Sequence, residues 1–110
     1  MIRHIVTFTF APDVPEAARR SLLDELETFP DRFPAMRGWS LGRNVSQRDD
    51  TYEWAFVVDF ADEASLLAYL NSEPHETFVA ERWRPVVARR AITTYAVPGA
   101  DVTASPRLAP

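Results

Sequence analysis

The chain of 110 residues contains no cysteine and no lysine, and its only histidines are His4 and His75. The absence of cysteine excludes disulfide bonds, thiolate metal sites and a cysteine nucleophile. All 12 basic residues are arginines, none in a run longer than two, and the formal net charge is -4. Nucleic-acid binding requires a cluster of basic side chains, so the sequence argues against a nucleic acid partner.

Long hydrophobic runs are also missing. No apolar run approaches the roughly 20 residues that a membrane span needs, and the first ten residues alternate instead of forming the apolar segment of a signal peptide. We therefore predict no membrane association and a cytoplasmic location. With 46% hydrophobic residues, the chain can build the core of a single domain. We predict this domain over 1–97, and a flexible tail over 98–110 because that segment is small, polar and proline-rich.

Hydrophobic periodicity predicts an α+β fold. Residues 2–10 alternate as a strand, and further strands are predicted at 37–46, 51–60 and 89–97. Helices are predicted within 11–29, with Asp13 and Glu16 as a capping box, over 63–71 after an Asp62 cap, and over 74–88, where Pro85 bends or splits the helix. Pro30 and Pro34 are expected to end the first helix. The expected buried stripes of the first two helices are Ala18, Leu22, Leu26 and Phe29, and Leu66, Leu67 and Leu70.

This order of elements predicts a ferredoxin-like, four-stranded antiparallel sheet covered by helices on one face. The other face would remain uncovered, and on the first strand it carries Ile5, Thr7 and Thr9. A half-apolar sheet face is most simply buried against a second copy of the chain. We therefore predict a homodimer in which two sheets form an α+β barrel.

The stretch YLNSEPHETF, residues 69–78, places Tyr69 and His75 on either side of Pro74. On one continuous helix these two side chains would point about 240° apart. Proline disfavours helical geometry at the preceding residue and has no N–H, so we expect one helix to end and another to begin here. Such a break allows Tyr69 and His75 to lie over the strand face that presents His4.

These three side chains are the candidate catalytic residues. They would converge at one end of an apolar pocket for a small hydrophobic carbonyl compound, lined by Val6, Phe8, Leu22, Leu26, Trp83 and Val86. A neutral His75 suits the role of general base, Tyr69 that of a donor to a developing enolate, and His4 that of an orienting partner. The helix dipole lowers the pKa of His75 whereas Glu73 and Glu76 raise it, so the sequence leaves the net direction open.

Simpler interpretations stay open for each residue. His4 is equally well explained as a strand histidine bonded to a backbone carbonyl, Tyr69 as a packing residue with its hydroxyl in water, and His75 as an ordinary first-turn residue. Two histidines without convergent carboxylates make a poor metal site, so we expect no bound metal. Ser72 lacks the surrounding motif of a serine hydrolase.

Several dispersed segments resemble the stress-responsive α/β-barrel (Dabb) family. They are IRHIVTFTF, GWSLGRNVS, YEWAFVVDFAD with ASLLAYL, and PHETF, in this order over roughly residues 2–97. The resemblance implies a small dimeric ferredoxin-like barrel. The family usually reads Tyr-x-x-His-Pro-x-His, whereas this chain reads Tyr-Leu-Asn-Ser-Glu-Pro-His, with Ser72 in place of the first histidine and the proline moved by one position.

The resemblance also implies a function. The family includes a plant polyketide cyclase that closes a poly-β-ketone thioester by aldol chemistry without a cofactor, and its active-site tyrosine and histidines match Tyr69, His75 and His4. Our leading hypothesis is therefore a cofactor-independent cyclase or aldol-type catalyst. The alternatives are a noncatalytic stress-response or ligand-binding barrel and a cofactor-free monooxygenase, because SEPHETF also resembles the corresponding segment of antibiotic-biosynthesis monooxygenases.

Overall fold

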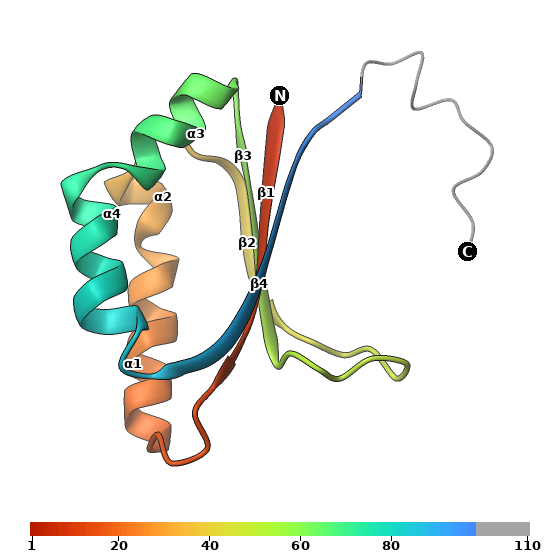
Figure 1. Cartoon of the computed structure of the whole chain (residues 1–110), viewed down its shortest axis with the longest axis vertical. Coiled ribbons are helices and arrows are strands. Elements are labelled where there is room, and N and C mark those ends of the chain that lie inside the picture. Colours follow the sequence, from red (N-terminus) through yellow and green to blue (C-terminus); the bar gives the residue numbers. More distant parts are fainter. Residues whose placement is uncertain (99–110) are drawn as a thin grey trace.

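The computed structural model describes residues 1–98 and shows one layer of helices on one face of a single sheet (Figure 1). In chain order the elements are β1 (Ile2–Phe10), α1 (Glu16–Glu27), α2 (Phe29–Arg32), β2 (Arg37–Arg43), β3 (Trp54–Phe60), α3 (Glu63–Leu70), α4 (Glu73–Phe78), the π-helical turn η1 (Val79–Trp83) and β4 (Val87–Ala96). The predicted tail lies, from residue 99 onward, outside the described residues.

The sheet is antiparallel throughout, with the strand order β2-β3-β1-β4. The two segments most distant in sequence, β1 and β4, are therefore neighbours, and His4 pairs with Thr94. This is the predicted four-stranded α+β arrangement with a central β1.

Strand alternation decides what the core contains. The inward residues of β1, from His4 to Phe10, are all buried, and Val58 and Phe60 of β3 lie beside them. The face of α1 that meets the sheet supplies Leu22, Leu23 and Leu26, as the helical spacing predicts. The edge strand β4 is exposed from Ala88 to Ala96, so the helical layer leaves even its inward side chains largely uncovered.

The predicted start of the first helix is wrong. Pro15, not Asp13, is the N-cap of α1, and no side chain caps this helix. Proline fixes φ near −64° here while ψ stays extended at 154°, so the helix begins at Glu16 and Asp13 lies too far upstream to reach its N–H groups. The helix ends at Glu27, and Pro30 lies in the first turn of α2.

Three further boundaries and one packing residue differ from prediction. The hairpin strands are shorter, because the Asn44 side chain bonds the carbonyls of Asp49 and Tyr52 and holds 44–53 as a loop. The last helical segment ends at Trp83, so Pro85 follows the helix and does not bend it. On α3, Leu67 is 51% exposed, and Tyr69 is buried with Leu66.

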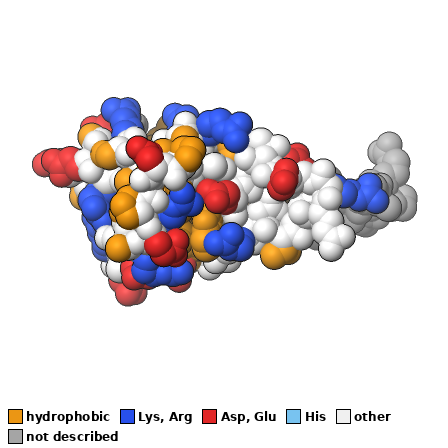
Figure 2. All heavy atoms as spheres, turned by 90° about the horizontal axis from the view of Figure 1, so that it is seen from below, with side chains coloured by type: hydrophobic (Ala, Val, Ile, Leu, Met, Phe, Trp, Pro, Cys, Tyr) orange, Lys and Arg blue, Asp and Glu red, His pale blue; other side chains and the backbone are white. Residues whose placement is uncertain are grey.

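The surface charges are mixed. Viewed from one end, acidic and basic side chains alternate over the helical side of the molecule without a large area of either sign (Figure 2). Within residues 1–98 no helix combines the length and the apolar composition that crossing a membrane requires.

Candidate active site

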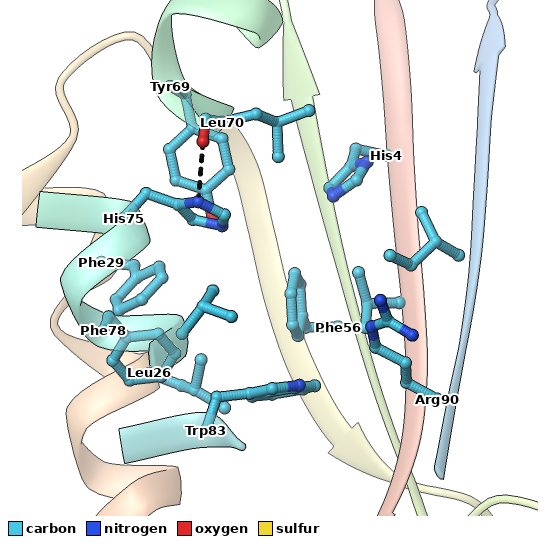
Figure 3. A pocket seen from close by; sticks show the side chains of 13 residues that line it. His4, Leu26, Phe29, Phe56, Tyr69, Leu70, His75, Phe78, Trp83 and Arg90 are labelled. Carbon is cyan, nitrogen blue, oxygen red and sulfur yellow. Dashed lines mark hydrogen bonds between the residues drawn. The ribbon is translucent and has the colours of Figure 1, made fainter. Parts of the chain in front are cut away.

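A cavity of about 160 Å³ lies between the sheet and the helical layer. The three predicted catalytic residues all contribute to its wall, His4 from the sheet and Tyr69 and His75 from the helices (Figure 3). The remaining wall is mostly aliphatic and aromatic, and consists of Val6, Leu26, Phe29, Phe56, Leu70, Phe78, Val79, Trp83, Arg90 and Ile92.

The break between α3 and α4 brings Tyr69 and His75 together. The Ser72 hydroxyl donates to the Tyr69 carbonyl at 2.7 Å and accepts the backbone N–H of His75 at 3.3 Å, so one side chain joins the end of α3 to the start of α4. The two rings then lie 4.6 Å apart, centroid to centroid, at an interplanar angle of 59°. The residue that replaces the family's usual histidine is thus the N-cap of α4.

His75 presents one nitrogen to the protein and leaves the other free to act as a base. Its Nδ1 lies 3.0 Å from the Leu70 carbonyl oxygen. A carbonyl can only accept, so Nδ1 carries the proton, and Nε2 of the neutral ring holds the lone pair. Burial lowers the pKa of His75 and outweighs the opposing effects of the Leu70 bond and of Glu76. The direction that the sequence left open is therefore toward the neutral base.

His4 reaches the cavity from the centre of the sheet. The side chain is 3% exposed, and its Nδ1 lies 2.8 Å from the hydroxyl oxygen of Thr94 on β4. The partner is thus a threonine side chain, not the backbone carbonyl of the simpler interpretation. Burial lowers the pKa of His4, and the proximity of His75 adds to this effect. Both imidazoles are accordingly neutral near pH 7.

Tyr69 is anchored by its ring and open at its hydroxyl. The ring packs edge-on against Phe33 at 4.9 Å and lies 5.4 Å from Phe60. Burial raises the pKa of the Tyr69 phenol, so the hydroxyl stays protonated as a hydrogen-bond donor. Within residues 1–98 the Tyr69 hydroxyl bonds no other residue, and no fully buried side-chain oxygen there lacks a partner. The hydroxyl is therefore not sealed in the core, and Tyr69 borders the cavity.

The cavity wall includes three of the six residues that were predicted to line a pocket. Val6, Leu26 and Trp83 border the cavity. Phe8 and Leu22 are buried core residues that do not border the cavity, and Val86 packs against the core outside the cavity wall.

Sequence reasoning missed several wall residues and Thr94. Phe56 was detectable, since it lies on the inward phase of an alternating strand. Arg90 and Thr94 were not, because β4 carries no apolar alternation that shows which phase faces inward. Among residues 1–98 no group of three histidine or acidic side chains is placed to hold a metal ion.

The sequence profile of the stress-responsive A/B barrel domain matches residues 2–97. The chain belongs to this family, known as Dabb. A Dabb protein of ferredoxin-like fold from Mesorhizobium loti shares 26% identity with a TM-score of 0.79, over 89% of this chain and 97% of its own. No match to a curated protein was found by sequence.

Two more distant structures share the fold of this Dabb chain. A dimeric ferredoxin-like protein of unknown function from Thermobifida fusca has 24% identity and a TM-score of 0.73, over 87% of this chain and 90% of its own. A hydroxynitrile lyase from Passiflora edulis has 20% identity and a TM-score of 0.80, over 88% and 93% of the respective chains.

Proposed function

We propose that this Dabb protein is a cofactor-independent enzyme that transfers protons to and from a small carbonyl compound, most specifically an aldol-type cyclase for a polyketide-like substrate. The observation that carries the proposal is the single cavity shared by a phenol donor and a neutral imidazole with a free Nε2. The hydroxynitrile lyase among the structural neighbours supports enzymatic activity on this fold.

The proton transfers and the stabilisation of the enolate in the proposed reaction are each assigned to a residue. His75 Nε2 removes a proton from the carbon between two carbonyl groups, and the Tyr69 hydroxyl donates a hydrogen bond to the enolate oxygen that forms. The enolate carbon attacks a third, more distant carbonyl of the same molecule, forming a C–C bond while the C=O π bond opens to an alkoxide. The imidazolium returns its proton to that alkoxide, which leaves His75 neutral again. His4, oriented by Thr94, borders the same space.

The cavity volume limits the size of the reacting part of the substrate. An apolar cavity of about 150 Å³ is known to hold benzene, and this one measures about 160 Å³. The reacting segment should therefore approach the size of a single aromatic ring.

The test uses pentane-2,4-dione, a neutral compound that fits this volume. Its enol absorbs in the ultraviolet, and the decay of this absorbance after dilution into buffer reports proton transfer at carbon. We expect the protein to accelerate the decay and His75→Asn to reduce that acceleration by about 10²-fold or more. Asparagine keeps a donor for the Leu70 carbonyl but lacks the base.

Three results would contradict the proposal. Decay no faster than in buffer favours the noncatalytic ligand-binding barrel. Equal acceleration by the protein and by His75→Asn excludes His75 as the base. A strict requirement for oxygen in the turnover of any substrate would instead indicate the monooxygenase.

We also propose that the protein is a homodimer. Ile5 and Val57 are neighbours in the sheet, and they lie half-buried on the face away from the helices. The dimeric Thermobifida fusca structure of the same fold supports this assembly.

A further inference from the structure

Among residues 1–98, Arg90 is the only side chain of the cavity wall that carries a permanent charge. It lies on the sheet side, across the cavity from the helices that carry Tyr69 and His75 (Figure 3). Its register partner on β1 is Phe8, and strand alternation places it on the same face as Ile92 and Thr94. Arg90 therefore places a cation at the border of a mostly apolar cavity, opposite its polar residues Tyr69 and His75.

Within residues 1–98 this guanidinium has no anionic partner. The ion pairs of the described chain use five other arginines, namely Arg3, Arg19, Arg20, Arg32 and Arg82. Arg90 also makes no side-chain hydrogen bond there, whereas its neighbour Arg89 bonds the Thr51 carbonyl and lies over the Tyr52 ring. The five N–H donors of Arg90 thus remain available to a ligand.

We propose that Arg90 binds a carboxylate of the substrate, so that the enzyme acts on a small carbonyl compound that is also an anion. A guanidinium pairs with both oxygens of a carboxylate and thereby orients it as well as binding it. The apolar body of the substrate would then lie along Phe56 and Trp83, with its reacting carbonyl at Tyr69 and His75. This inference rests on the proposed function and specifies the substrate class of the same site.

The opposing explanation is that Arg90 is an edge-strand charge that only protects β4 from pairing with other chains. The two explanations differ in ligand selection. If Arg90 only protects the strand edge, the protein should bind a carboxylate and its neutral isostere with equal affinity.

The test compares benzoate with benzamide, which have the same shape and differ in charge. Titration calorimetry on the full chain should show benzoate binding about fivefold more tightly, the size expected for a partly exposed ion pair. Arg90→Gln should remove this preference, and added salt should weaken benzoate binding while leaving benzamide binding unchanged. Arg89→Gln is the matched control, because Arg89 lies one residue away on the opposite face of β4.

The inference is overturned if the protein binds the two compounds equally, if it binds neither, or if Arg89→Gln reduces the preference as much as Arg90→Gln. These outcomes are independent of the enol assay, whose substrate is uncharged. If the protein accelerates enol decay but does not prefer benzoate, the proposed function stands and the carboxylate site is rejected. If the protein prefers benzoate but does not accelerate enol decay, it is a noncatalytic barrel with a carboxylate-binding site.

Discussion

The ring of Tyr69 packs in the core, whereas its hydroxyl is the proposed hydrogen-bond donor to the substrate. A mutation that removes only the hydroxyl separates these two contributions. Tyr69→Phe removes a hydroxyl that bonds no residue within 1–98, so the free energy of unfolding should change by less than about 1 kcal/mol. Loss of a donor to the enolate should slow enol decay by about 10²-fold. Denaturant titration and the absorbance assay measure the two effects.

Tyr52→Phe provides the control for the loss of a phenol hydroxyl. Tyr52 lies outside the cavity wall, so this variant should retain full acceleration of enol decay. Equal activity of Tyr69→Phe and the unaltered protein would show that the Tyr69 hydroxyl does not stabilise the enolate.

Two helices of similar length offer a comparison at the scale of the element. Asp62 caps α3 by accepting from Ser65 N–H at 2.8 Å, and Ser72 caps α4 by accepting from His75 N–H. Replacing either cap with alanine should cost about 1 kcal/mol of stability. Only Ser72 joins Tyr69 to His75, so Ser72→Ala should also lower turnover, by about tenfold if the His75 ring shifts relative to the Tyr69 hydroxyl.

Asp62→Ala separates a loss of stability from a loss of positioning. We expect Asp62→Ala to keep full turnover under conditions in which both alanine variants are folded. Ser72→Thr retains the hydroxyl, so it should keep the turnover that Ser72→Ala loses. Matched losses of turnover in the two alanine variants would show that Ser72 acts only through helix stability.

At the scale of the whole molecule, the two buried imidazoles make stability depend on pH. The pKa of each histidine is lowered by folding, so between pH 6.5 and the lowered values the unfolded chain binds protons that the folded chain does not. The free energy of unfolding should therefore fall with decreasing pH below about 6.5, by at most about 1.4 kcal/mol per pH unit for each histidine.

Urea titrations between pH 5 and 8 measure this slope, and His75→Asn should reduce it. Asp59 does not interfere, because its hydrogen bonds from Arg3 hold the pKa of this carboxyl below its usual value and its contribution is lost only at more acidic pH. An unchanged slope in His75→Asn would contradict a lowered pKa for His75.

The proposed homodimer gives a second prediction for the whole molecule. Val57→Asp places a charge on the uncovered sheet face, so it should convert the dimer to a monomer in sedimentation velocity experiments. Leu67→Asp is the control, because Leu67 is exposed on the helical side and should leave the dimer intact. A protein that sediments as a monomer at all concentrations would refute the dimer.

Local patterns were sufficient for the order of the four strands, for the inward phase of β1 and for the break near Pro74, but they did not predict the short helix α2. Each of these depends on residues a few positions apart: alternation places His4 and Val6 on one face, and proline geometry interrupts a helix wherever it occurs. The exact helix starts were less predictable, as Asp13 shows, because the backbone conformation at Pro15 set the start of α1.

The amino-acid sequence by itself thus determined the fold class and the choice of Tyr69, His75 and His4, because periodicity and proline chemistry are local. Only the tertiary structure decided that β4 lies beside β1, which brings Thr94 to His4 and Arg90 to the cavity across about 90 positions of sequence. It also decided that Phe8 and Leu22 fill the core while Phe56 borders open space. Strand pairing and side-chain packing are settled by contacts between distant segments, and no local pattern specifies them.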